Sequence, residues 1–155
     1  MGQPGDGVEF VDLDRSRLAE VRSLILSGLE EHWGELDPTL NPDVDDLLAS
    51  YPDGRTIVAV RDDVVVGTGT IRPVGDGQAE IIRMSVAVTA RRTGLGAQIV
   101  EVLVDTARAW GCHSVVLETT STWTDAIAFY QRCGFTITGT EVTDVGEDTW
   151  FVRPL

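Results

Sequence analysis

The segment that decides the fold runs from residue 81 to residue 98 and reads IIRMSVAVTARRTGLGAQ. Its first half, residues 81–88, is rich in apolar and β-branched residues and follows a Gly-Asp-Gly turn at 75–77, which predicts a strand. Beyond it the apolar residues recur at helical spacing, at Leu95, Ile99, Val102, Leu103 and Trp110. The segment therefore predicts a strand that passes through a tight glycine turn into a long helix.

The turn between this strand and this helix has the features of an anion site. The first turn of a helix carries N–H groups without internal partners, at the positive end of the helix dipole. Gly94 and Gly96 lack a Cβ that would keep an anion away, and Arg91 and Arg92 add positive charge. Two glycines after a strand often form only a turn. Together with the arginines, however, they indicate a phosphate or pyrophosphate site.

Two other nucleotide-binding patterns do not fit this turn. A dinucleotide-binding fingerprint requires a third glycine where Ile99 stands. A phosphate-binding loop of the ATPase type requires Gly-Lys-Ser/Thr, and the chain contains no lysine. The remaining pattern is Arg-x-x-Gly-x-Gly between a strand and a helix.

This pattern resembles the pyrophosphate-binding motif of the GCN5-related N-acetyltransferase (GNAT) superfamily. A second segment, AIAFYQRCGF from Ala126 to Phe135, resembles the A-x-x-[FL]-Y-x-x-x-G-F segment of the same superfamily. The resemblance covers residues 55–151 well and the first fifty residues loosely. It implies an α+β fold in one domain, with a mostly antiparallel, splayed mixed sheet flanked by about four helices.

The resemblance also implies an acetyl-coenzyme A-dependent N-acetyltransferase that transfers an acetyl group directly to a primary amine of a small molecule or peptide. The alternative is a non-catalytic acyl-coenzyme A-binding module with the same fold. By resemblance, the backbones of Met84, Ser85 and Val86 contact the acetyl and pantetheine parts. The implied pyrophosphate contacts are Arg91, Arg92, Thr93, Gly94, Leu95, Gly96 and Ala97.

Tyr130 stands where the family carries its usual general acid, and a phenol within hydrogen-bond reach can protonate a leaving thiolate. The alternative for Tyr130 is a place in an apolar helical stripe with Ala126, Phe129 and Cys133. Glu80 and Glu118 resemble positions that serve as general base in some members. Either can instead be a solvated strand residue.

Two departures from the family pattern and one titratable residue accompany these assignments. Trp123 stands where many relatives carry an asparagine that contacts the cofactor, and Val88 stands where many carry proline. His32 lies in the region that often borders the acceptor site and is a candidate there.

The formal net charge of −13 is unevenly distributed. Residues 1–60 carry 13 acidic and 4 basic side chains, and residues 61–155 carry 12 and 8. Nucleic acid is not an expected partner, because its binding requires neutralisation of phosphates. The acidic residues Glu30, Glu31, Glu35 and Asp37 are candidates for a wall that receives a cationic acceptor. A solvated acidic face is the alternative.

The chain is expected to form one domain over residues 8–155, preceded by a short disordered tail at residues 1–7. No apolar run approaches the ~20 residues of a membrane span, and no signal pattern opens the chain, so a cytoplasmic location is expected. Cys112 and Cys133 are expected to be reduced and buried, and no metal-ligand spacing is present. The resemblance makes a homodimer a candidate oligomeric state.

The remaining elements are predicted from the same patterns. Strands are expected at residues 8–11, 56–61, 64–72, 114–119, 135–142 and 149–153. Helices are expected from a cap at Asp14 to about Glu31, after Asn41-Pro42, and from a capping box at residues 122–125 to Gly134. Asp43, Asp45 and Asp46 are expected to favour the positive end of the helix after Asn41.

Overall fold

The structure is a computed structural model that describes residues 7–37 and 39–155. Its centre is a seven-stranded sheet in the order β1-β2-β3-β4-β5-β7-β6. The strands are β1 (Val8–Asp12), β2 (Arg55–Arg61), β3 (Val64–Gly75), β4 (Gln78–Val86), β5 (Ser114–Thr120), β6 (Thr136–Thr143) and β7 (Gly146–Pro154). The α-helices of the described residues are α1 (Leu18–Trp33), α2 (Leu47–Ser50), α3 (Leu95–Ala109) and α4 (Thr124–Arg132).

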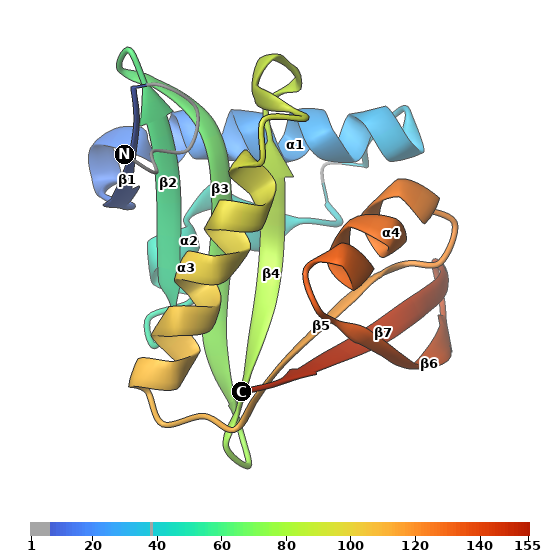
Figure 1. Ribbon diagram of the computed structural model, residues 1–155. Helices are drawn as coiled ribbons and strands as arrows, with labels where there is room; N and C mark the ends of the chain where they lie inside the picture. The colour runs from blue at the N-terminus through green and yellow to red at the C-terminus, as the bar shows by residue number, and fades with distance from the viewer. Residues whose placement is uncertain (1–6, 38) are drawn as a thin grey trace.

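Helices cover both faces of the sheet (Figure 1). The alternation of side chains along β2 shows the two layers, since Ile57 and Ala59 belong to the apolar cluster under α3. Val58 and Val60 point to the opposite face and join the cluster under α1 and α2. Both faces of the amino-terminal half of the sheet are therefore buried, which explains why residues 57–60 are all apolar.

The pairing of the strands is antiparallel throughout, with the exception of β4 and β5, which run parallel. These two strands pair only where Gln78–Glu80 faces Ser114–Val116. Beyond that point they separate, and Figure 1 shows the opening between them. The expected α+β fold with a mostly antiparallel, splayed mixed sheet and four helices is confirmed.

The segment after Asn41 differs from the predicted helix. A 3₁₀ turn, η2 (Pro42–Asp45), comes first, and the side chain of Asn41 makes no capping hydrogen bond. Asp46 caps the short α2 instead, by accepting a hydrogen bond from the backbone N–H of Ala49 at 3.0 Å. Val44 and Leu47 are both almost completely buried, and the non-helical backbone of Asp46, with a φ of −151°, separates the two short pieces.

The predicted capping box at residues 122–125 is also wrong. Trp123 occupies the N-cap position of α4, and no side chain there makes a capping hydrogen bond. The predicted capping role of Asp14 agrees better with the structure. The carboxylate of Asp14 accepts a hydrogen bond from the backbone N–H of Ser16. Asp14 is therefore the N-cap of the 3₁₀ turn η1 (Arg15–Arg17), which directly precedes α1.

The sequence also led to expectations about the cysteines, membrane spans and the amino-terminal tail. Both cysteines are free thiols, and both are half-buried, less than the full burial expected of them. Among the described residues, no helix is both long enough and apolar enough to cross a membrane. The expected disordered tail lies outside the described residues, apart from Gly7, and stays a prediction.

Candidate active site

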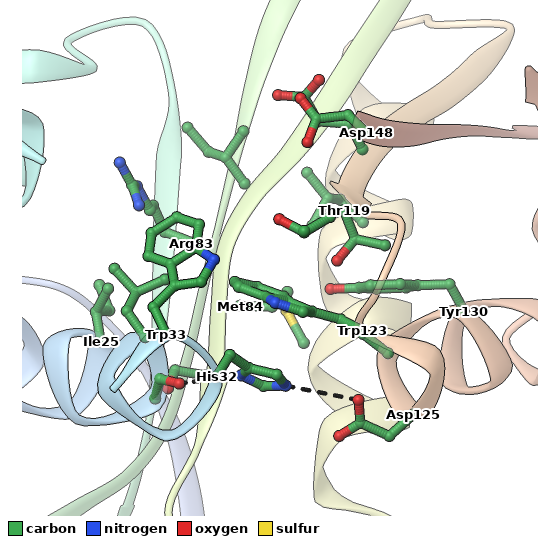
Figure 2. Close-up of a pocket in the computed structure, with 18 of the residues that line it drawn as sticks. Ile25, His32, Trp33, Arg83, Met84, Thr119, Trp123, Asp125, Tyr130 and Asp148 are labelled. Carbon is green, nitrogen blue, oxygen red and sulfur yellow. Dashed lines mark hydrogen bonds and ion pairs between the residues drawn. The ribbon is translucent and has the colours of Figure 1, made fainter. Parts of the chain in front are cut away.

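The separation of β4 and β5 opens a cavity of about 570 Å³. Its walls come from α1, from the free half of β4, from the end of β5, from the start of α4 and from the β6–β7 hairpin. Figure 2 shows side chains from these elements converging on it, among them Met84, Thr119 and Tyr130. Because β5 does not pair with residues 81–86, the backbone of β4 has no strand partner on this side.

A bulge in β4 shapes the wall of this cavity. Arg83 and Met84 together stand opposite the single residue Gly69 of β3, and Arg83 has a φ of 54°. A Cβ on Gly69 would lie 2.5 Å from the sulfur of Met84, so any larger residue there would require the Met84 side chain to move. The bulge lies at the expected acetyl and pantetheine contacts, Met84, Ser85 and Val86.

The side chains at the bulge point to opposite faces. Met84 joins the apolar cluster under α3. The hydroxyl of Ser85 faces α1 and donates to the carbonyl oxygen of Leu24 at 3.2 Å. Any contact from Ser85 to a cofactor between β4 and β5 therefore comes from its backbone, as the sequence predicts.

An ion pair that the sequence analysis missed holds the bulge. Arg83 donates from Nε and Nη2 to the two carboxylate oxygens of Asp43, at 2.9 and 2.7 Å, and Tyr51 donates to the same carboxylate at 2.7 Å. Partial burial, the largest influence, opposes ionisation of Asp43. The hydrogen bonds from Arg83 and Tyr51 outweigh it and lower the pKa. Asp43 therefore anchors β4 to η2, whereas its position in the sequence suggested a helix-dipole contact.

The glycine turn has an open geometry that suits a pyrophosphate. Arg92 and Gly94 both have left-handed backbones, with φ values of 62° and 86°, and α3 begins at Leu95. No side chain caps this end of α3, so the first N–H groups of the helix stay free of internal partners. A Cβ on Gly94 would meet nothing within 4 Å, so the space in front of the turn is empty.

Gly96 has a different neighbour from the one expected. A Cβ on Gly96 would lie 3.1 Å from the ring of Phe129, so the missing side chain makes room for α4. The anion-binding argument for Gly96 is therefore limited to its backbone N–H in the first turn of α3.

The two arginines of the turn are in different situations. Arg91 donates to both carboxylate oxygens of Glu31 in the last turns of α1, at 2.6 and 2.7 Å, and to the carbonyl oxygen of Val86 at 3.1 Å. The Arg91 guanidinium correspondingly lowers the pKa of Glu31. Arg92 is exposed and has no ion-pair partner among residues 7–37 and 39–155. Arg92 is thus the cation of this turn whose charge is available to a ligand.

Tyr130 fits both interpretations that its sequence position allows. Its ring packs against Phe129, Phe135 and Phe151, with centroid distances of 5.0, 6.1 and 5.9 Å, and the residue is only 9% exposed. Its hydroxyl points into the cavity (Figure 2) and has no hydrogen-bond partner within the described chain. Burial raises the pKa of Tyr130, so the phenol keeps its proton and remains a donor.

Both candidate bases line the cavity, in different surroundings. Glu80 is 6% exposed and accepts two hydrogen bonds from Arg72 on one oxygen, at 2.8 and 3.1 Å. Glu118 is exposed and receives no ion pair from the described residues. Partial burial and then the negative charges of Asp148, Glu80 and Glu141 raise the pKa of Glu118.

The four acidic residues expected at the acceptor site do not line this cavity. Glu31 pairs with Arg91, which itself lines the cavity. Glu30 and Asp37 border a separate groove of about 160 Å³ beside Arg22, and Glu35 is exposed. The acidic residues that do reach the cavity are Glu80, Glu118, Asp125, Glu147 and Asp148.

Aromatic side chains close one mouth of the cavity. Trp123 stacks on His32 with a centroid distance of 4.1 Å and also contacts Trp33 at 5.3 Å. The Nε2 of His32 lies 3.5 Å from a carboxylate oxygen of Asp125, a pair that is ionic only when His32 is protonated (Figure 2). Trp123, where relatives carry asparagine, therefore joins α4 to α1 across the cavity.

Comparison with known protein families identifies a match over most of the chain. Residues 18–135 match the family model described as "Acetyltransferase (GNAT) family". An IAA acetyltransferase of Azospirillum brasilense is 35% identical over 113 residues, which cover 72% of this chain and 74% of that protein. N-acetyltransferase 8 of Homo sapiens is 32% identical over 116 residues, which cover 69% of this chain. The match spans about half, 51%, of that longer relative.

Solved structures share the fold over nearly the whole chain. An acetyltransferase of the GNAT family from Staphylococcus aureus Mu50 superposes with a TM-score of 0.85, over 96% of this chain and 99% of that one, at 18% identity. The PaiA N-acetyltransferase of Thermoplasma acidophilum, solved in complex with coenzyme A, superposes with a TM-score of 0.80. That superposition covers 96% and 99% of the two chains at 14% identity, so the likeness concerns the fold.

Proposed function

Because the chain belongs to the acetyltransferase (GNAT) family, it is an acetyl-coenzyme A-dependent N-acetyltransferase, and we propose that it transfers the acetyl group directly to a primary amine of a small molecule or peptide. One observation carries the proposal. The cavity between the diverging strands β4 and β5 contains the carboxylates of Glu80 and Glu118 and the hydroxyl of Tyr130, which has no hydrogen-bond partner among the described residues.

The residues of the chain suit acetyl-coenzyme A, which supplies the reactive thioester. The free N–H groups in the first turn of α3, together with Arg92, hold the pyrophosphate. Residues Met84–Val86 offer backbone groups along the edge of β4 that β5 leaves unpaired, apart from the carbonyl oxygen of Val86, which accepts a hydrogen bond from Arg91. Arg91 has a structural role, because its hydrogen bonds to Glu31 and to the carbonyl oxygen of Val86 fix the segment between β4 and the glycine turn.

The reaction needs two proton transfers, and the cavity provides a group for each. The amine nitrogen attacks the thioester carbonyl carbon, the carbon–sulfur bond breaks, and Glu80 or Glu118 accepts the proton that the amine loses. Tyr130 donates its proton to the departing thiolate, and the products are the N-acetylated amine and free coenzyme A. The cavity walls bring the reactants together, and no covalent enzyme intermediate is required.

Calorimetric titration with acetyl-coenzyme A, with NAD and ATP as controls, tests the cofactor site. Selective binding of acetyl-coenzyme A is expected, followed by release of free thiol when a panel of primary amines is added. Binding without transfer to any amine would favour the alternative, a non-catalytic acyl-coenzyme A-binding module. Absence of binding by the folded protein would reject the assignment of the glycine turn.

A homodimer and a cytoplasmic location remain parts of this proposal. Both rest on the family resemblance and on the composition of the chain. Light scattering on the purified protein measures the first, and fractionation of the native cells measures the second.

A further inference from the structure

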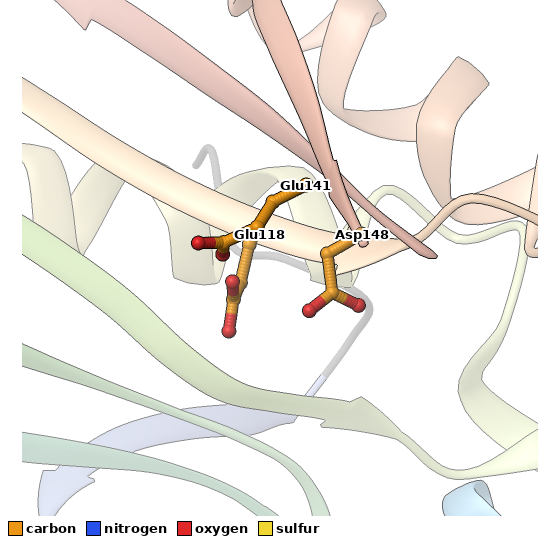
Figure 3. A group of neighbouring side chains, drawn as sticks. All are labelled: Glu118, Glu141 and Asp148. Carbon is orange, nitrogen blue, oxygen red and sulfur yellow. The ribbon is translucent and has the colours of Figure 1, made fainter. Parts of the chain in front are cut away.

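Three carboxylates from three neighbouring strands meet at one end of the cavity. Glu118 lies on β5, Glu141 on β6 and Asp148 on β7, and their carboxylate oxygens lie within 4.8 Å of one another (Figure 3). The strand register produces this meeting, because Asp148 stands opposite both Glu141 and Thr120. Glu118 precedes Thr120 by two residues and so points to the same face of the sheet.

These three carboxylates have no positive partner within the described chain. None of them takes part in an ion pair, and the one side-chain hydrogen bond among them is donated by Trp150 to Glu141 at 3.4 Å. Partial burial and then neighbouring carboxylates raise the pKa of both Glu118 and Asp148. Three negative charges in such proximity repel one another, and a bound cation would relieve the repulsion.

The opposite wall of the cavity does not supply that cation. Arg72 is paired with Glu80, and Arg83 is paired with Asp43 on both of its carboxylate oxygens. Each arginine is thus already neutralised by its own carboxylate. Among the described residues, the charge on this side of the cavity is negative and comes from Glu118, Asp148 and the adjacent Glu147.

The cluster and the reaction centre share one cavity. Glu118 and Asp148 line the same space as Tyr130, a buried residue whose unpartnered hydroxyl is directed into it (Figure 2). A ligand that reaches Tyr130 with one end can therefore place its other end beside the carboxylates. This requires a ligand with a reactive group at one end and a positive charge at the other.

We propose that the acceptor is a diamine or a longer polyamine, whose distal ammonium binds between Glu141 and Asp148, beside Glu118, while its near amine receives the acetyl group. This inference rests on the acetyl transfer proposed above. It assigns Glu141 and Asp148 to recognition of the acceptor and leaves the proton transfers to Tyr130 and to Glu80 or Glu118.

A divalent metal ion is the other cation that such a cluster could hold. Calcium takes six to eight oxygen ligands and magnesium demands octahedral geometry, whereas the cluster offers three carboxylates, of which those of Glu118 and Asp148 line the cavity. An alkylammonium needs fewer and less strictly arranged oxygen atoms, and its carbon chain would lie along the cavity. The structure therefore favours the organic cation.

The test compares α,ω-diamines, beginning with diaminobutane, with n-alkylamines of the same carbon number. For the wild-type enzyme we expect kcat/KM to be about tenfold or more higher for the best diamine, since one retained ion pair of this kind corresponds to about a factor of ten. Asp148→Asn and Glu141→Gln should each remove most of this preference through KM. Their kcat/KM for the monoamine should fall much less than that for the diamine, and their affinity for acetyl-coenzyme A should remain unchanged.

Asp144→Asn is the matched control, because it removes an exposed acidic residue from the same hairpin without touching the cluster. Its preference for diamines should equal that of the wild type. The preference should also fall as salt is added, because screening weakens the attraction between the cluster and the ammonium. Equal rates for diamine and monoamine in the wild type, or equal losses on both in the variants, would overturn the proposal.

A binding measurement separates this inference from the proposed catalysis. Calorimetry of diaminobutane with the coenzyme A-saturated protein should show binding that Asp148→Asn weakens about tenfold. If that binding occurs but no amine is acetylated, the subsite stands and the proposed reaction fails. If calcium or magnesium binds in an Asp148-dependent manner while the diamines do not, the cluster is a metal site and the proposal is wrong.

Discussion

Arg83, in the bulge of β4, donates two hydrogen bonds to Asp43 of η2, at 2.7 and 2.9 Å. The two side chains are 22% and 20% exposed, so the pair is largely shielded from water. Arg83 has a positive φ of 54°, a backbone conformation that a residue with a Cβ rarely adopts. The ion pair therefore stabilises the irregularity of β4 on which the shape of the cavity depends.

Replacement of Asp43 by asparagine should destabilise the protein by about 1–3 kcal/mol, because the charge of Arg83 then stays partly buried without its counter-charge. Asp45→Asn is the control, since Asp45 pairs with Arg22 on the surface. That substitution should change the free energy of unfolding by less than about 0.5 kcal/mol. Urea unfolding of both variants measures the difference, and equal effects would contradict a special role for Asp43.

The effect of Asp43 should also depend on pH. Its pKa is lowered in the folded protein, so its contribution is complete above about pH 4, the pKa of an unperturbed aspartate. The contribution is lost as the pH falls toward the folded pKa. The stability difference between wild type and Asp43→Asn should therefore shrink in acid.

Replacement of Gly94 by tryptophan should abolish binding of acetyl-coenzyme A, because the new side chain occupies the open space in front of the α3 amino terminus. Gly111→Trp is a close control. Gly111 has a similar φ of 81°, and a Cβ there would also meet nothing within 4 Å, but it lies at the other end of α3. Titration calorimetry should find normal affinity in Gly111→Trp. Retained affinity in Gly94→Trp would exclude this turn as the pyrophosphate site.

Replacement of Tyr130 by phenylalanine should lower kcat about 100-fold while leaving the affinity for acetyl-coenzyme A unchanged. The lost hydroxyl has no hydrogen-bond partner among the described residues, so thermal stability should hardly change. Tyr51→Phe provides the contrast, because that hydroxyl donates to Asp43 and its loss should lower the melting temperature. Unaltered turnover in Tyr130→Phe would leave Tyr130 with a packing role only.

Replacement of Glu118 by glutamine should raise the melting temperature at neutral pH. The pKa of Glu118 is raised in the folded protein, so the folded state binds this proton more tightly than the unfolded state. Ionisation of Glu118 therefore destabilises the folded protein. This loss of stability begins as the pH rises through the pKa of Glu118 in the unfolded state, about 4.3, and is complete above its pKa in the folded state. The advantage of Glu118→Gln should therefore disappear near pH ~3, where both proteins carry a neutral group. An unchanged melting temperature at neutral pH would contradict the predicted cost of partial burial and of repulsion by the neighbouring carboxylates, and Glu147→Gln controls for loss of charge alone.

The general base should be identifiable from pH–rate profiles of Glu80→Gln and Glu118→Gln. The variant that lacks the base should lose the rise of kcat/KM with pH, and the other should keep it. Glu80→Gln also leaves Arg72 without its carboxylate, so a thermal unfolding curve must accompany its kinetics. If both variants keep the rise, another group or a water chain accepts the proton.

The sequence predicted those parts of the site that depend on local structure. The strand, the glycine turn and α3 follow from residue periodicity and from two glycines, and the turn at Gly94 has the left-handed backbone that favours glycine. The second motif likewise placed Tyr130 on a helix that packs beside the turn. The part in acceptor binding predicted for Glu30, Glu31, Glu35 and Asp37 stays a prediction, since none of the four lines the cavity.

The order of elements, the helix amino terminus that is open to an anion and the family motifs could all be predicted from the chain, because they depend on near neighbours in it. Which distant residues meet depends on how the elements pack. Arg91 pairs with Glu31 across 60 positions, and Arg83 pairs with Asp43 across 40. The meeting of Glu118, Glu141 and Asp148 depends on the register of three strands, and a shift of one residue would turn a carboxylate to the opposite face.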